Sequence, residues 1–402
     1  MKKTLLLVLL VGVLGSVIAS NGKRAKSTIV TGADQTDKYL PYLKGKRIGM
    51  VVNQTSIIGK THSVDSFKSL GINIVKIFGP EHGFRGNASA GVHVDDEKDS
   101  KTGIEVVSLY GKNHKPSKES LSGVDLMVFD IQDVGARFYT YIATMHRVME
   151  ACAENGKELL ILDRPNPNGY LIDGPILDMT NKSGIGIHPV PIAHGMTVGE
   201  YAKMINGEKW LANGVQCKIT VIPVANYSHE MSYELPVSPS PNLNTPESVI
   251  LYPSTCLFEG TVISQGRGTY FPFTVLGNPE LRGKYNFSFT PKSIKGMSET
   301  PLHMNKECFG LNLRKPKVVA DLRKSGKINI KWMMELYAAY PDKAKFFDSS
   351  QSKEIGNIDR LAGVKEFKEQ IVAGISEQVI RESWEKGLEG FKKMREKYLI
   401  YK

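Results

Sequence analysis

The chain has 402 residues, of which 41% are hydrophobic and 23% charged, and its formal net charge is +11 at pH 7. This composition is typical of globular proteins and excludes disordered, collagen-like and coiled-coil chains. The length exceeds that of one ordinary core and predicts two domains. The four cysteines are far apart and form no CxxC pair, which excludes a zinc ribbon and a thioredoxin-like redox motif.

Residues 1–20 are typical of a secretory signal peptide. Two lysines precede the apolar run 5–18, and the small residues Ala19 and Ser20 follow it. The run is shorter than the roughly 20 apolar residues of a membrane-spanning helix. We therefore expect cleavage near Ser20, no stable membrane anchor, and a product exported to the periplasm or the cell exterior. The spread of the lysines along the chain favours a merely solvated basic surface, and the alternative for an exported protein is a surface that binds anionic envelope polymers in place of nucleic acid.

From residue 46 onward, short runs rich in Val, Ile, Leu and Phe alternate with helix-like stretches, the pattern of βα units on a parallel sheet. Residues 140–154 have apolar side chains at helical spacing, and Thr197 and Glu200 have the spacing of a capping box. The sequence therefore predicts an α/β fold with a Rossmann-like, doubly wound and mostly parallel sheet. Its six expected strands are residues 48–52, 74–78, 105–109, 126–131, 159–162 and 219–224.

The sequence changes character near residue 230. Five prolines lie within residues 235–253, which predicts an extended crossing segment in place of a helix or a central strand. Mixed short strands follow, and a helix is expected around residues 371–398. The expected organisation is a signal peptide at 1–20, a Rossmann-like α/β domain at 27–230 and a smaller α+β domain at 231–402.

Polar side chains cluster where the expected strands end, which is where open parallel sheets bind ligands. Carboxylates, amides, guanidinium groups and aromatic rings together are typical of sugar recognition. The candidates after the first, second, fourth and fifth strands are Asn53, Glu81, His82, Asp130, Asp133, Arg137, Tyr139, Asp163, Arg164 and Asn166.

Several common sites are excluded by the residues present. Asn53, Gln54 and Thr55 stand where a dinucleotide site has its GxGxxG turn. The sequence contains no Walker-type loop, no G-x-S-x-G elbow and no HExxH helix. We expect neither a cofactor nor a metal.

Several motifs, in this order along the chain, resemble those of one enzyme family. The chain is similar to the NamZ-type exo-acting β-N-acetylmuramidases, bacterial glycoside hydrolases long labelled as a domain of unknown function. The motifs are GPEHGFRG at 79–86, DIQDVGARFYTY at 130–141, DRPNP at 163–167, SPNL at 240–243, YP at 252–253, FEGT at 258–261, GRGT at 266–269 and DRLAG at 359–363.

The resemblance spans nearly the whole chain beyond residue 20. It implies a Rossmann-like domain and a smaller C-terminal domain with the active cleft between them. The implied activity is release of N-acetylmuramic acid (MurNAc) from the non-reducing ends of peptidoglycan fragments such as MurNAc-β-1,4-GlcNAc. The implied partners are therefore peptidoglycan-derived muropeptides. The proposed catalytic glutamate of this family falls on Glu81, which would protonate the departing glycosidic oxygen as a general acid.

The second catalytic group stays open at this stage. Asp130, Asp133 and Asp163 are candidates for the second carboxylate, and the acetamide of the substrate is an alternative nucleophile. His82 would tune Glu81, bind the sugar or hold the turn. The expected catalytic residues are thus Glu81, His82, Asp130 and Asp133.

Other residues are candidates for binding the sugar. Arginines suit the lactyl carboxylate, although at least one is expected to pair with Asp133 or Asp163 instead. Tyrosines suit the sugar ring and asparagines its hydroxyl or acetamide groups. His188 and His194 are expected to be structural. The candidates are Asn53, Arg137, Tyr139, Asp163, Arg164, Asn166, Asn242, Tyr252, Glu259 and Arg267.

Two other functions remain open from the sequence. One is a non-catalytic muropeptide-binding protein, which would bind a MurNAc disaccharide without turnover. The other is a hydrolase for a different envelope substrate, such as a metal-using esterase built on Asp130, Asp133 and Asp163, which would lose activity in a chelator.

Overall fold

The structure is a computed structural model that describes residues 28–80, 83–85, 97–111, 114–349 and 357–401. The expected signal peptide lies outside these ranges, and so do Glu81 and His82. No helix within the described ranges is both long and apolar enough to cross a bilayer.

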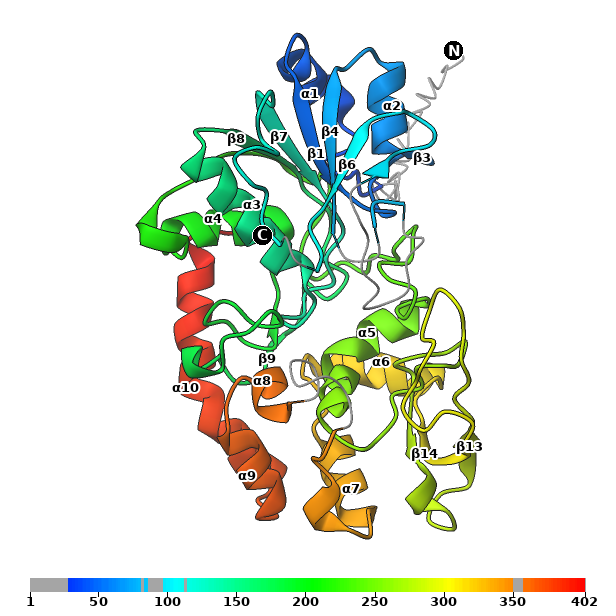
Figure 1. Ribbon diagram of the computed structural model, residues 1–402. Helices are drawn as coiled ribbons and strands as arrows, with labels where there is room; N and C mark the ends of the chain where they lie inside the picture. Colours follow the sequence, from blue (N-terminus) through cyan, green and yellow to red (C-terminus); the bar gives the residue numbers. More distant parts are fainter. Residues whose placement is uncertain (1–27, 81–82, 86–96, 112–113, 350–356, 402) are drawn as a thin grey trace, which may run out of the picture.

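A seven-stranded sheet forms the centre of the N-terminal half (Figure 1). Six of its strands are parallel, match the six expected strands to within two residues, and confirm the predicted fold class. The seventh, β5, is antiparallel to β6 at the edge. The strand order is β11(Lys218–Ile222), β8(Glu158–Leu162), β7(Leu126–Asp130), β1(Ile48–Val52), β4(Ile74–Gly79), β6(Glu105–Ser108) and β5(Glu97–Lys98).

Helices cover both faces of this sheet because its strands are apolar on both sides. In β1, Val51 packs into the core that contains α3(Tyr141–Glu154) and α4(Val198–Gly207). Its neighbours Met50 and Val52 point the other way, into the core of α1(Thr36–Leu43) and α2(Ser63–Ser69). Alternation along a strand thus builds two layers of helix on one sheet. The capping box expected at Thr197 and Glu200 is present at the start of α4.

One expectation about the crossing segment is wrong. Residues 235–245 contain no helix or strand, but α5(Pro246–Thr255) follows directly. Pro246 occupies the first turn, where a missing backbone N–H costs nothing, and Thr245 forms a capping box with Ser248. Pro253 lies close to the helix end, so two prolines are accommodated in a helix of 10 residues.

The C-terminal half contains a three-stranded antiparallel sheet, in the order β12(Val275–Asn278), β14(Cys308–Asn312) and β13(Phe287–Phe289). The helix expected around residues 371–398 is present but begins later, at Glu377, because Gly374 adopts a positive φ that separates it from a preceding helix. The helices beyond this sheet are α6(Pro316–Ser325), α7(Lys331–Ala339), α8(Ile358–Ala362), α9(Glu366–Val372) and α10(Glu377–Glu396).

Helix α10 returns the chain to the N-terminal half (Figure 1). Arg395 Nη2 donates to the Gly195 carbonyl at 2.5 Å, and Tyr401 Oη donates to Asp163 Oδ2 at 2.6 Å. The remaining elements are short: β2(Ile57–Ile58), β3(Thr61–His62), β9(Ile172–Asp173), β10(Ala193–His194), η1(Met179–Asn181), η2(Ala212–Gly214), η3(Cys256–Gly260), η4(Pro279–Leu281) and η5(Lys343–Lys345).

Candidate active site

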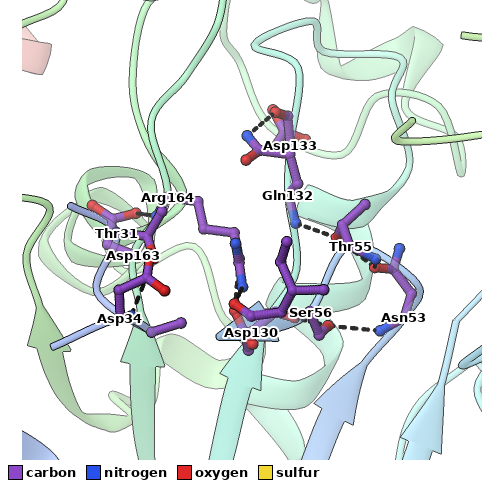
Figure 2. A network of polar contacts seen from close by, with 12 residues as sticks. Thr31, Asp34, Asn53, Thr55, Ser56, Asp130, Gln132, Asp133, Asp163 and Arg164 are labelled. Carbon is purple, nitrogen blue, oxygen red and sulfur yellow. Dashed lines mark hydrogen bonds and ion pairs between the residues drawn. The ribbon is translucent and has the colours of Figure 1, made fainter. Parts of the chain in front are cut away.

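The carboxyl ends of β1, β7 and β8 carry a network of buried polar side chains (Figure 2). Asn53 Oδ1 accepts hydrogen bonds from Thr55 N at 2.9 Å and Thr55 Oγ1 at 2.5 Å. Thr55 Oγ1 in turn accepts from Gln132 N at 3.0 Å, which joins the loop after β1 to the loop after β7. Asn53, a predicted sugar-binding residue, therefore holds its loop with its oxygen, while its Nδ2 has no partner among the described residues.

Asp130 and Arg164 form a buried ion pair within this network (Figure 2). Arg164 Nε donates to Asp130 Oδ1 at 2.7 Å, and Nη2 donates to the Ile57 carbonyl at 2.9 Å. The two side chains are 0% and 2% exposed. The structure thus gives Arg164 a role in joining loops, and its expected contact with a substrate carboxylate stays a prediction.

Asp163 is fully enclosed and accepts four hydrogen bonds. Its Oδ2 accepts from Thr197 Oγ1 at 2.7 Å and from Tyr401, and its Oδ1 accepts from Gly199 N at 2.8 Å and Arg164 N at 3.0 Å. Burial raises its pKa to about 6, against the effect of these donors. Asp163 therefore anchors the start of α4 and the chain end, which corrects its assignment to sugar binding.

Asp133 lies in an apolar environment beyond β7. Its Oδ2 accepts from Gly135 N at 2.6 Å and lies 3.8 Å from His194 Nε2. Burial raises the pKa of Asp133 to about 7 and lowers that of His194 to about 3, so both side chains tend toward their neutral forms. Asp133 Oδ1 has no partner among the described residues. A carboxyl group in this state is unsuited to the role of a permanently charged catalytic group.

The variant Asp133→Asn tests this environment through stability. Because the folded-state pKa lies above the ordinary value, the contribution of Asp133 to stability falls as the pH rises from about 4 to about 7. We expect the melting temperature of the variant to exceed that of the wild type at pH 8. The difference should be about 2–4 °C for each kcal/mol that burial of the charged carboxylate costs the wild type. It should shrink as the pH falls toward 4. Thermal unfolding of both proteins across this range checks it, and a pH-independent gap would contradict it.

The side chains of Arg137 and Asn166 also form hydrogen bonds with backbone groups that hold the fold together. Arg137 Nη1 donates to the Pro175 and Val190 carbonyls at 3.0 and 2.8 Å. Its Nη2 donates to the Leu361 and Ala362 carbonyls of α8 at 2.9 and 2.7 Å. Asn166 donates from Nδ2 to the Met196 carbonyl and accepts from Asn168 N. Both side chains are buried, and their predicted sugar-binding roles are replaced by structural ones.

The other five predicted sugar-binding residues line one cavity between the two halves of the chain. We call it the tyrosine pocket and define it by Tyr139, Tyr141, Asn242, Tyr252, Glu259 and Arg267. Its volume is about 90 Å³, so in this state it admits part of a sugar rather than a whole one. Tyr141, the third tyrosine of this group, is like Tyr139 and Tyr252 one of the rings that the sequence offers for stacking on a sugar.

Aromatic rings form the walls of the tyrosine pocket. The Tyr139 ring lies edge-on to Tyr141 at 4.9 Å and to Tyr252 at 5.9 Å between centroids. Tyr252 in turn lies edge-on to Phe273 at 5.0 Å. Burial raises the pKa of Tyr139 and Tyr252, so both phenols stay neutral. The pocket therefore presents apolar ring surface to whatever enters it.

Glu259 and Arg267 form the polar end of the pocket. Arg267 Nε donates to Glu259 Oε1 at 2.7 Å, and the Arg267 side chain remains 25% exposed. Its terminal nitrogens have no hydrogen-bond partner among the described residues. Cys256, which is buried one turn before Glu259, donates from Sγ to Glu259 Oε2 at 3.6 Å. Asn242 Oδ1 also lacks a described partner.

The pocket is tied to the strand ends through one backbone carbonyl. Tyr139 Oη donates to the Pro239 carbonyl at 2.8 Å, and Gln54 Nε2 donates to the same carbonyl at 2.9 Å. Gln54 belongs to the loop after β1, and β4, which ends at Gly79, is the neighbour of β1 in the sheet. Glu81 follows β4 by two residues, but it lies outside the described residues.

Comparison with known proteins assigns the family. The N-terminal and C-terminal sequence models described as exo-beta-N-acetylmuramidase NamZ match residues 48–247 and 250–401. The chain belongs to the NamZ family. It is therefore a glycoside hydrolase. It is 40% identical to the peptidoglycan beta-N-acetylmuramidase NamZ of Bacillus subtilis (strain 168), over 95% of this chain and 94% of that protein.

Two solved structures support the same fold. Both are crystal structures of DUF1343 family proteins from Bacteroides fragilis NCTC 9343. One has a TM-score of 0.85 and 45% identity, over 94% of this chain and 99% of that chain. The other has a TM-score of 0.76 and 30% identity, over 93% and 99%.

The motifs of this NamZ chain divide between structural and pocket positions. DRLAG contains Gly363, at φ +89°, where a Cβ would lie 2.6 Å from Arg137 Nη2. This motif therefore leaves room for the Arg137 guanidinium. FEGT and GRGT supply Glu259 and Arg267, the polar end of the pocket. Among the described residues of this NamZ chain, no group of three His, Cys, Asp or Glu side chains is placed to hold a metal ion.

Proposed function

We propose that the protein hydrolyses the β-glycosidic bond of MurNAc at the non-reducing ends of peptidoglycan fragments, and that it is exported to meet them. The observation that carries this proposal is the tyrosine pocket with the Glu259–Arg267 pair at its polar end. Aromatic walls suit a sugar ring, and a half-buried guanidinium at the pocket suits a sugar that carries a carboxylate. Membership of the NamZ family, with a relative named as a peptidoglycan β-N-acetylmuramidase, supports it.

In this proposal Glu81 is the general acid. An alkoxide is a poor leaving group, so the C1–O4 bond of MurNAc-GlcNAc breaks only as the Glu81 carboxylic acid gives its proton to O4. The position of Glu81 just beyond β4 favours this role, because ligands bind at the carboxyl ends of parallel strands. Water supplies the hydroxyl group that C1 carries in the released MurNAc.

Mass spectrometry of the purified protein incubated with MurNAc-GlcNAc tests the activity. Hydrolysis gives free MurNAc and free GlcNAc in equal amounts. Saturable binding without these products would favour the non-catalytic muropeptide-binding protein instead. Loss of hydrolysis in a chelator would favour the metal-using hydrolase.

Arg267 is proposed to recognise the lactyl carboxylate that distinguishes MurNAc from GlcNAc. Lysine keeps the charge of arginine but loses its planar two-pronged donor geometry. We expect Arg267→Lys to raise KM for the 4-nitrophenyl glycoside of MurNAc by about 10–100-fold, the value of a charged hydrogen bond. The KM for the matching GlcNAc glycoside, which lacks the lactyl carboxylate, should change much less.

Arg282→Lys is the matched control, because Arg282 forms an exposed ion pair with Glu307. It should leave the MurNAc to GlcNAc ratio of kcat/KM unchanged. An Arg267→Lys enzyme with the wild-type ratio would show that another group reads the carboxylate.

A further inference from the structure

We propose that Glu259 is the second catalytic carboxylate and attacks C1 of the terminal sugar as a nucleophile. The inference rests on the proposed hydrolysis of MurNAc glycosides. It replaces Asp130, Asp133 and Asp163, which are the carboxylates that the sequence favours for this role.

The three aspartates are each unsuited to attack a sugar. Asp130 pairs with Arg164 at the strand ends, away from the tyrosine pocket, and both oxygens of Asp163 accept hydrogen bonds, from four donors in all. Asp133 is enclosed beside His194. None of the three lines the tyrosine pocket, whereas Glu259 is the carboxylate among the described residues that does.

The surroundings of Glu259 hold its carboxylate in one position. Arg267 Nε donates to Oε1 at 2.7 Å, while among the described residues Oε2 receives only the long contact from Cys256 Sγ at 3.6 Å. Burial raises the pKa of the Cys256 thiol well above its usual value, so the thiol keeps its proton and remains a donor. Oε2 is therefore the oxygen with the weaker partner and the one free to react.

The backbone at Glu259 is held as well. Ser349 Oγ donates to the Glu259 carbonyl at 2.7 Å. The next residue, Gly260, packs so closely that a Cβ there would lie 2.7 Å from Ile358 Cα of α8. A reacting group placed on a backbone locked in this way is preorganised for attack, which is what catalysis by positioning requires.

The ion pair with Arg267 favours a nucleophile over a general base. A base has to take up a proton, which would cancel the charge that Arg267 pairs with. A nucleophile needs no proton. In the first step Oε2 forms a bond to C1, the C1–O4 bond breaks, and Glu81 gives its proton to O4. In the second step water attacks C1, its proton passes to Glu81, and the Glu259 carboxylate is released.

Azide rescue tests the assignment. We expect Glu259→Gln to lower kcat on 4-nitrophenyl β-MurNAc at least about 100-fold, while the dissociation constant for MurNAc changes by less than about fivefold. With Glu259→Ala, sodium azide should restore release of nitrophenol and yield the α-glycosyl azide, because azide takes the place of Glu259. With Glu81→Ala, azide attacks the covalent intermediate from the other face and should yield the β-glycosyl azide.

Glu335→Gln is the matched control, since Glu335 is an exposed glutamate that accepts from Tyr285. It should keep wild-type turnover. A Glu259→Gln enzyme with normal kcat and raised KM would reduce Glu259 to a binding residue. A β-azide, or no rescue in a Glu259→Ala protein that still binds MurNAc, would also overturn the inference. A wild type without MurNAc release would overturn the proposed function itself.

Discussion

Glu81→Gln is expected to lower kcat/KM for MurNAc-GlcNAc by about 10²–10⁴-fold, the usual contribution of a positioned general acid. The amide of glutamine has nearly the shape of the carboxylic acid but has no proton of suitable acidity to give to O4. The loss should be much smaller for 4-nitrophenyl β-MurNAc, because nitrophenolate departs without being protonated. Steady-state kinetics on both substrates measures the difference.

The ratio between the two substrates distinguishes chemistry from folding. A misfolded or weakly binding Glu81→Gln protein would lose activity on both substrates by the same factor. Glu335→Gln again provides the control for the purification and the assay. Equal losses on the disaccharide and the aryl glycoside would remove Glu81 from the role of general acid.

The fold could be predicted from sequence wherever local pattern and tertiary environment agree. The six parallel strands have apolar side chains on both faces, and helices cover both faces. The helix α5 escaped prediction because Pro246 and Pro253 count against a helix by composition. Their positions at its two ends are what makes them tolerable.

The site was predicted less completely, because a motif does not say which way its side chains point. Arg137 and Arg267 both stand in glycine-containing motifs that resemble the same family. Arg137 donates hydrogen bonds to carbonyls of α8, more than 220 residues away in sequence. Arg267 instead lines the tyrosine pocket. Only the packing of the C-terminal half against the N-terminal half separates the two cases.

The same packing explains why the sequence pointed to Glu259 as a sugar-binding residue and not as a catalytic one. It faces Tyr139 and Tyr141 across the tyrosine pocket although the chain separates them by more than 100 residues. Cys256 offered a local hint, since a residue three positions before Glu259 lies on the same side of a helical turn. The spacing of Cys256 and Glu259 does not predict the pocket, because the pocket is lined by residues from both halves of the chain.

Arg164→Ala is expected to destabilise the protein by about 3–5 kcal/mol, because it leaves the Asp130 carboxylate buried without its partner. It also removes the donor to the Ile57 carbonyl, which helps to hold the loop after β1. Thermal and urea unfolding against the wild type measure the loss. The double variant Asp130→Leu with Arg164→Met should recover much of it, because apolar replacements remove the need for a countercharge.

The activity of Arg164→Ala tells whether the substrate is bound at the tyrosine pocket or at the strand-end network, the buried polar side chains at the ends of β1, β7 and β8. Arg164 does not line the tyrosine pocket, so at a temperature where Arg164→Ala remains folded its KM for MurNAc-GlcNAc should stay within about threefold of the wild type. A large rise in KM with little loss of stability would mean that Arg164 reaches the substrate. In that case the strand-end network, and not the tyrosine pocket, would be where the carboxylate of the sugar is recognised.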